Sequence, residues 1–349
     1  MADLQKYFEK FHATIRVDAD VLISKRDIIV SKIRKHLSDN NLPGFEVLNQ
    51  GSYIYGVGIE PIADLEHDID VGLAFNIRAD QYSATTVRGW VLDAVKNHTD
   101  SVKEKGPCIR VHYAAGFHVD LVVYSKRTSS DDLEDFKLAH KDNSWHPTDP
   151  KALKDFIANA RESFKLTKVN GEGDQLQRVV RYLKRWNDEA IPRESDDKPF
   201  GLSLLLLAIK SLSPTTFANG YPDDMSGLEQ VARSAASAVG NLDVRKPTPQ
   251  YENVFGKLSS SAMQNLKSRF LKLANTLQNA KHEADADKAA ELVRSVLGSD
   301  FPTPENLHKS LAAYSLDEAI QNRIRASKSS AIMRSVADVQ DPPKPWRQH

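Results

Sequence analysis

The segment Gln50-Gly51-Ser52-Tyr53, followed by Glu66-His67-Asp68-Ile69-Asp70-Val71, is the stretch that decides the fold of this chain. In its second part, apolar residues alternate with Asp68 and Asp70, which predicts a strand with both carboxylates on one face. Residues two apart on a strand lie about 7 Å apart at their Cα atoms, so both carboxylates can bind one divalent cation. Without a cation the two charges would repel each other. The pair therefore predicts a metal site.

A turn precedes this acidic strand. The segment Phe45-Glu46-Val47-Leu48 is expected to form a strand that ends at Gln50, Gly51 and Ser52. Glycine lets the backbone approach an anion closely, and backbone N–H groups and a serine hydroxyl can donate hydrogen bonds to phosphate oxygens. The turn is therefore a candidate phosphate site beside the acidic pair.

A third acid lies in a later strand. Residues 108–113 and 117–124 are expected to form a hairpin, and Asp120 is the only acid of its second strand. A carboxylate inside an apolar strand is costly to bury unless a cation or a donor pairs with it. We therefore interpret Asp120 as a third metal ligand. His118 lies on the same face of the strand and either supports the site or is a structural histidine.

The remaining patterns predict an α+β fold. Two amphipathic helices precede the first strand, and strands near 45–49, 69–75, 108–113 and 117–124 surround a helix around residues 87–95. From Asp149 onward the pattern is helical, with helices expected over 150–164, 174–190, 200–213, 225–239, 258–281 and 284–298. We expect a mixed sheet with helices in residues 1–165, a helical domain in 166–326, and a tail in 327–349 with little to bury.

Composition excludes several other classes. The 47 basic and 47 acidic residues balance, so no overall field draws the chain to nucleic acid or to an anionic membrane. Cys108 is the only cysteine, which excludes an internal disulfide and a cysteine-based zinc cluster and favours a reducing compartment. The longest apolar run, residues 200–209, is too short to span a bilayer. We therefore expect a cytoplasmic protein without membrane attachment.

The motifs resemble those of the CD-NTases, bacterial cyclic-oligonucleotide synthases of anti-phage CBASS systems. This family is related to the animal DNA-sensing cyclic dinucleotide synthase and to the oligoadenylate synthases, within the DNA polymerase β-like nucleotidyltransferase superfamily. Gln50-Gly51-Ser52 resembles the family's phosphate turn, Asp68-Ile69-Asp70 its paired metal ligands, and Asp120 its third acid. The resemblance implies a bilobed molecule, with a nucleotidyltransferase core, a C-terminal helical domain and an active site between them.

The resemblance continues into the helical part. Residues 176–186 are similar to the helix that these enzymes place across the triphosphate, so Lys184 would contact phosphate and Ser203 would add a hydroxyl. Val57 stands where many relatives carry a threonine. The residues alone leave an alternative open, because an apolar stripe runs along the same helix. In that interpretation its basic residues form a solvated face: Arg178, Arg181, Lys184 and Arg185.

The resemblance also implies the chemistry. Two Mg²⁺ ions, or Mn²⁺ in their place, would be held by Asp68, Asp70 and Asp120. Nucleoside triphosphates, ATP and/or GTP, would be joined into a cyclic di- or oligonucleotide with release of pyrophosphate, and partner proteins of a defence operon would regulate the enzyme. Two alternatives remain open: a nucleotidyltransferase acting on an RNA, protein or small-molecule acceptor, and a non-catalytic sensor of nucleotides or nucleic acid.

Overall fold

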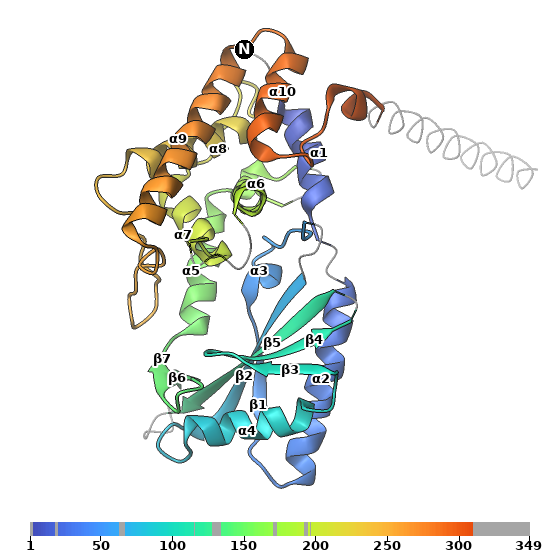
Figure 1. Ribbon diagram of the computed structural model, residues 1–349, viewed down its shortest axis with the longest axis vertical. Helices are drawn as coiled ribbons and strands as arrows, with labels where there is room; N and C mark the ends of the chain where they lie inside the picture. Colours follow the sequence, from blue (N-terminus) through green and yellow to red (C-terminus); the bar gives the residue numbers. More distant parts are fainter. Residues whose placement is uncertain are drawn as a thin grey trace, which may run out of the picture. The chain divides into compact units, whose positions relative to one another are not determined.

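The computed structural model describes residues 3–17, 20–62, 67–114, 116–127, 134–169, 173–191, 195 and 197–309 (Figure 1). Residues Met1–Phe301 form one compact unit and Pro302–His349 a second one. The site lies in the first unit. The tail expected over 327–349 lies outside the described residues, and the domain boundary expected near residue 165 falls within the first unit and stays a proposal.

A mixed β-sheet forms part of the first unit. Within the described residues its strands are β1 (Phe45–Asn49), β2 (His67–Arg78), β3 (Ser101–Glu104), β4 (Ile109–Tyr113), β5 (Phe117–Arg127), β6 (Glu134–Ala139) and β7 (Trp145–Pro147). The order is β1-β2-β5-β4-β3, while β6 pairs with the far half of β5 and β7 pairs with β6. Strands β2 and β5 are parallel, and the other pairs are antiparallel.

Two helices cover one face of this sheet. Apolar side chains of β2 and β5 form one buried core with side chains of α2 (Asp20–Asp39) and α4 (Ala84–Val95). Because side chains alternate along a strand, the intervening residues of β2 and β5 point to the opposite face. Asp68, Asp70 and Asp120 belong to that second set. The core on the helix-covered side thus determines which way the acids point.

The four strands expected from the sequence are confirmed, and β3, β6 and β7 were missed. The missed strands are short and rich in charged or aromatic residues, such as Ser101-Val102-Lys103-Glu104 in β3. Their apolar alternation is too brief to be recognised, and long-range pairing with β4 and β5 stabilises them instead.

The chain after the sheet is helical, as expected. All six helices predicted there are present: α5 (Pro150–Glu162), α6 (Gln175–Ala190), α7 (Gly201–Ser211), α8 (Asp224–Ser237), α9 (Ser260–His282) and α10 (Ala286–Leu297). A short 3-10 helix, η1 (Lys165–Thr167), precedes α6. No described helix combines the length and the apolar character that a membrane crossing would require.

Helix α1 (Gln5–Ile15) packs with these helices, against α6 and α8, whereas α2 packs on the sheet. The aromatic rings of Phe8 and Phe11 lie 5.3 to 5.4 Å, between ring centroids, from the rings of Tyr182 and Phe301. Such contacts add to the free energy gained by burying the rings. The first helix of the chain and the end of the unit therefore share one core.

Helix α6 begins at a well-defined cap. The Asp174 carboxylate accepts a hydrogen bond from the backbone N–H of Gln177 at 3.0 Å, and the Gln177 side chain accepts one from the backbone N–H of Asp174 at 3.2 Å. This capping box satisfies two backbone donors that the helix leaves unpaired. It determines where α6 starts, and hence the position of Lys184 along it.

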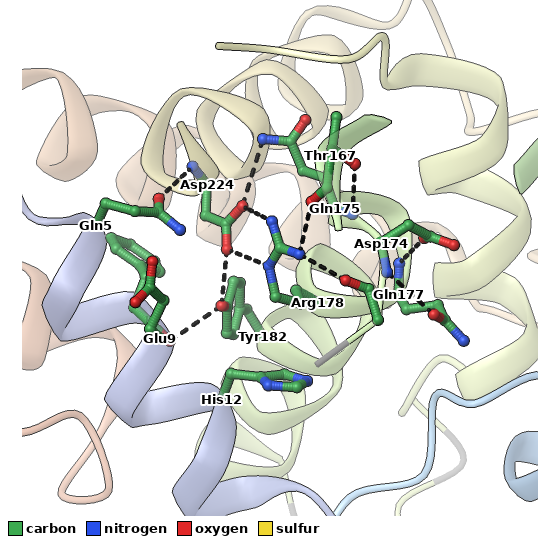
Figure 2. Close-up of polar contacts among 12 residues, drawn as sticks. Gln5, Glu9, His12, Thr167, Asp174, Gln175, Gln177, Arg178, Tyr182 and Asp224 are labelled. Carbon is green, nitrogen blue, oxygen red and sulfur yellow. Dashed lines mark hydrogen bonds and ion pairs between the residues drawn. The ribbon is translucent and has the colours of Figure 1, made fainter. Parts of the chain in front are cut away.

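The arginines of α6 are not a solvated face. Arg178, Arg181 and Arg185 are all buried. The Arg178 guanidinium donates to both carboxylate oxygens of Asp224 on α8, at 2.7 and 2.8 Å, and the Tyr182 hydroxyl donates to the same carboxylate at 3.0 Å (Figure 2). The interpretation of these arginines as an ordinary solvent-facing surface is therefore wrong. Their buried polar contacts connect α6 to neighbouring segments of the chain.

The environment of His12 on α1 makes the free energy of unfolding depend on pH. It is buried, and Arg181 donates to its Nε2. Burial lowers the pKa of His12 to about 3, and the charges of Arg181 and Arg178 act in the same direction. Below pH 6.5 the His12 imidazole binds a proton in the unfolded chain, whereas in the folded protein it stays neutral over most of this range. We expect the free energy of unfolding to fall by about 1.4 kcal/mol per pH unit between pH 6.5 and 3 from this group.

Urea unfolding at several pH values measures this slope. His12→Gln keeps an acceptor for Arg181 and should remove that part of the slope, whereas the same change at the exposed His282 should leave it unaltered. Equal slopes in His12→Gln and the parent protein would contradict the assignment.

Candidate active site

The three acids expected from the sequence meet on one face of the sheet. In the parallel pairing of β2 with β5, Asp70 lies opposite Asp120 and Asp68 lies opposite His118. Asp68, His118 and Asp120 each offer a ligand atom, and these atoms lie within 4.8 Å of one another. Side chains opposite each other on neighbouring strands share a face. The strand pairing therefore brings together acids that are about 50 positions apart in the sequence.

His118 contacts the first of these acids. Its Nε2 lies 3.1 Å from Oδ1 of Asp68. The ring of His118 is fully buried, whereas the Asp68 side chain is 43% exposed. A buried ring against an accessible carboxylate holds that carboxylate in one orientation. The supporting role considered for His118 therefore has a geometric basis.

Arg110 holds the third acid, and no motif in the sequence indicated it. The Arg110 guanidinium donates from Nε and Nη2 to the two carboxylate oxygens of Asp120, at 2.7 and 2.6 Å. Arg110 lies opposite Asp120 in the antiparallel pairing of β4 with β5. A carboxylate has about four lone-pair positions, so Asp120 can accept both bonds and still bind a cation. The alternation within residues 108–113, which predicts a strand paired with that of Asp120, is the sequence signal that could have indicated Arg110.

The surroundings of the Asp70 carboxyl disfavour its ionised form. Burial, first, and the negative charges of Asp68 and Asp120 together raise the pKa of its carboxyl to about 8, against the opposing charges of Arg110 and Lys184. Asp68, Asp70 and Asp120 can all be ionised at such close range only if positive charge compensates them. Oxygen donors are also the ligands that Mg²⁺ and Mn²⁺ prefer. The donor set thus fits a hard divalent cation.

The expected phosphate turn is present as a single helical turn, α3 (Gly51–Ile54). The side-chain oxygen of Gln50, just before it, accepts a hydrogen bond from the Tyr124 hydroxyl at 3.0 Å. Gly51 has a positive φ of 84°, and a Cβ atom there would lie 2.2 Å from Oδ2 of Asp70. Glycine is therefore required at position 51 for two reasons: its backbone conformation and its approach to the acid.

Gly51→Ala tests this approach. The added methyl group must displace either Asp70 or the turn, and a displacement of about 1 Å at a reacting group costs on the order of 100-fold in rate. We expect a loss of activity at this site of that size in a folded protein. Gly44→Ala is the matched control, because a Cβ atom at Gly44 meets nothing within 4 Å. Equal activity in Gly51→Ala and the parent would show that the turn does not position Asp70.

A cavity of about 1000 Å³ opens beside these residues. Its described lining includes Gly51, Ser52, Asp68 and Asp70 from the sheet side. Residues of α6 and α7 and of the loop before α9 also line it, among them Lys184, Phe200 and Lys257. A volume of this order is large enough for nucleotides.

Lys184 reaches the cavity from α6. Its ammonium group donates to the backbone carbonyl of Val57 at 3.0 Å. Burial lowers the pKa of Lys184 to about 8, and nearby carboxylates, Asp188 first, oppose that shift. Because the bond to position 57 uses only the backbone, valine in place of threonine does not affect it. The phosphate contact expected of Lys184 stays a prediction that this location supports.

Ser203 lies elsewhere. Its side chain is buried, and its hydroxyl donates to the backbone carbonyl of Val254 at 2.8 Å. It is not among the described residues that line the cavity, because it lies on the buried face of α7. The geometry therefore gives no support to the nucleotide contact expected of Ser203. Phe200 and Lys257, which no sequence pattern indicated, do face the cavity. The Phe200 side chain is 61% exposed, with the Lys257 ammonium 5.5 Å from its ring centroid.

Comparisons with known proteins cover the part of the chain that forms this site. Residues 45–124 match the model of a family described as cyclic GMP-AMP synthase DncV-like, nucleotidyltransferase domain. A cyclic GMP-AMP synthase of Escherichia albertii is 26% identical over 173 residues, which cover 47% of this chain and 36% of that protein. A c-di-GMP synthase of Roseivirga ehrenbergii is 23% identical over 313 residues, covering 79% of this chain and 80% of that protein.

Among solved structures, the crystal structure of Vibrio cholerae DncV cyclic AMP-GMP synthase has the same fold. The TM-score is 0.68 at 17% identity, over 87% of this chain and 99% of that chain. The expected α+β fold class, a nucleotidyltransferase core with a C-terminal helical part, is confirmed, as is the resemblance to the CD-NTases. The matched domain contains the turn at Gln50-Gly51-Ser52 and all three acids.

Proposed function

We propose, from the premise that this chain carries the DncV-like nucleotidyltransferase domain of the CD-NTase family, that it synthesises a cyclic di- or oligonucleotide second messenger. The substrates are nucleoside triphosphates, ATP and/or GTP, and pyrophosphate is released. One observation carries the proposal: Asp68, Asp70 and Asp120 meet on adjacent strands, directly beside the Gly51 turn and a cavity of nucleotide size.

Each residue has a role in this reaction. The backbone N–H groups and hydroxyl of Gly51 and Ser52 bind the triphosphate, and Gln50 holds the start of the turn through Tyr124. Asp120, held by Arg110, would lie beside the attacking ribose hydroxyl. Asp68, Asp70 and Asp120 would hold two Mg²⁺ ions, or Mn²⁺, which supply stabilisation of the charge that develops on the attacking and leaving oxygens.

Lys184→Met tests the phosphate contact. A charge-assisted hydrogen bond to phosphate is worth about 1.5 to 3 kcal/mol, so KM for the triphosphate should rise about 10- to 100-fold. In the parent protein KM should also rise above about pH 8, as the ammonium loses its proton, and Lys184→Met should lack that rise. Lys154→Met, an exposed lysine on α5, is the control. An unchanged KM would exclude the contact.

The product decides between the open alternatives. The purified protein is incubated with all four labelled triphosphates and Mg²⁺ or Mn²⁺, treated with phosphatase, and analysed by mass spectrometry. A phosphatase-resistant product absent from an Asp68→Asn/Asp70→Asn variant supports the proposal. Linear products alone contradict cyclisation. Turnover only after addition of an RNA, protein or small-molecule acceptor favours the second nucleotidyltransferase alternative, and nucleotide binding without turnover favours a sensor.

The proposal includes a cellular context. A second-messenger synthase of this family acts in the cytoplasm, where its triphosphates are, and the single buried Cys108 is compatible with a reducing compartment. We place it in anti-phage defence, with regulatory partner proteins from the same operon. Co-expression with the neighbouring genes, followed by measurement of product before and after phage infection, tests this part separately.

A further inference from the structure

A second cluster of candidate metal ligands lies at the turn between β6 and β7. His140, Asp142 and His146 each offer a ligand atom, and these atoms lie within 4.8 Å of one another. Of the described residues that line the nucleotide cavity, none belongs to this trio. The cluster is therefore separate from the three acids of the active site.

The hairpin itself brings the three side chains together. Strands β6 and β7 pair antiparallel, with Leu138 opposite His146. The turn is closed by a hydrogen bond from the backbone N–H of His140 to the carbonyl of Ser144 at 2.9 Å, and Asn143 takes a positive φ of 69°. The imidazole rings of His140 and His146 consequently lie 5.1 Å apart between their centroids.

The donor atoms converge. Nδ1 of His140 lies 3.0 Å from Oδ1 of Asp142. The Ser144 hydroxyl donates to the same carboxylate oxygen and lies 2.6 Å from Nε2 of His146. Two imidazole nitrogens, one carboxylate oxygen and a neighbouring hydroxyl form a set of N and O donors that suits Zn²⁺, whereas the all-carboxylate site suits Mg²⁺.

Contacts outside the turn hold it in place without any ion. The side-chain oxygen of Asn143 accepts from the backbone N–H and the hydroxyl of Thr85, at 3.0 and 2.7 Å, at the start of α4. The backbone N–H of Lys141 donates to the carbonyl of Gly106 at 2.9 Å. A Cβ atom at Gly106 would lie 2.6 Å from Nε2 of His140, so a glycine there makes room for the ring. The ligands are thus pre-organised, which reduces the entropy cost of binding.

We propose that His140, Asp142 and His146 form a second metal site, selective for a zinc-class divalent ion over Mg²⁺, with the Ser144 hydroxyl or a water as the fourth ligand. Strand β7 runs directly into Thr148 and Asp149, which line the nucleotide cavity. A bound ion would therefore stabilise the hairpin that leads to the cavity wall.

Calorimetric titration with Zn²⁺ tests the site. The Asp68→Asn/Asp70→Asn protein is the parent, so that zinc binding by the active-site acids is weakened. We expect one tight equivalent of Zn²⁺ that a 1,000-fold excess of Mg²⁺ does not displace. Both His146→Ala and Asp142→Asn should weaken binding by at least about 10-fold. His282→Ala removes an exposed histidine from α9 and should change nothing. Co²⁺ bound in place of Zn²⁺ should give the visible absorption of a four-coordinate ion, and His146→Ala should abolish it.

Two results would contradict the second metal site. If His146→Ala and Asp142→Asn bind Zn²⁺ as tightly as the parent, or if binding is weak and equal in all variants, the trio is only a hydrogen-bonded turn. Circular dichroism and thermal unfolding of each variant without metal show whether it is folded. Should His146→Ala fail to fold, Asp142→Asn decides alone, because it keeps the side-chain shape and removes the charge.

Discussion

Asp70→Asn is expected to lower the rate of nucleotidyl transfer by about 1,000-fold or more while leaving the fold intact. The carboxylate is on the strand position opposite Asp120, feels the charges of Asp68 and Asp120, and lies close to Gly51. An amide of the same shape cannot supply the negative charge that a divalent cation needs, and loss of an electrostatic contact to the transition state costs this order of rate. Product formation with saturating triphosphates and Mg²⁺ is the measurement. A rate within about 10-fold of the parent would exclude Asp70 from the metal site.

The same change should make the protein more stable when metal is absent. Burial and the neighbouring acids raise the pKa of Asp70 to about 8, so its ionisation destabilises the folded state as pH rises from about 4 to 8. Asn removes that charge. In EDTA at pH 8.5, Asp70→Asn should therefore unfold at a higher temperature than the parent.

Asp120→Asn is the informative comparison for this result. It should lose activity too, but it should unfold at a lower temperature, because it weakens the two charge-assisted bonds from Arg110. The two variants thus separate an acid whose charge is destabilising on balance without metal from an acid that is paired with Arg110. Equal thermal shifts in both variants would contradict this difference.

Asp224→Ala is expected to lower the free energy of unfolding by about 3 to 5 kcal/mol. It leaves the Arg178 guanidinium buried without its carboxylate, and Arg178 is only 1% exposed. It also removes one of the two acceptors of the Tyr182 hydroxyl, which still contacts the backbone carbonyl of Phe8 (Figure 2). Urea unfolding measures the loss. Asp224→Ala should lower the free energy of unfolding more than the loss of an exposed ion pair does, because removal of one partner of a buried ion pair leaves an uncompensated charge.

Two controls sharpen this prediction. Asp39→Ala breaks an exposed pair with Lys35 on α2, where both side chains are more than half exposed, and should cost less than about 1 kcal/mol. The double variant Arg178→Met/Asp224→Leu removes both charges and should be less destabilised than Asp224→Ala alone. If Asp224→Ala costs no more than Asp39→Ala, the pair between α6 and α8 does not stabilise the unit.

Local sequence pattern was enough for the four longer-patterned strands, for the helices after the sheet and for the acids, but not for β3, β6 and β7. A period of two places Asp68 and Asp70 on one face of β2, and a period near 3.6 with breakers such as Pro150 and Gly298 indicates the helices after the sheet. These features depend on residues a few positions apart, so the sequence contains them directly. The direction of the acids follows as well, because the apolar set of β2 must face a core.

Contacts between distant segments could not be derived in this way. Arg110 meets Asp120 because β4 pairs with β5 in one particular register, and a shift of one residue would turn it to the other face. Ser203 points away from the cavity, and Arg178 is buried against Asp224, because of how α6, α7 and α8 pack. The sequence by itself determined which residues are chemically able to form a site. Only the tertiary structure decided which of them meet, because strand register and helix packing depend on the burial of side chains far apart in the chain.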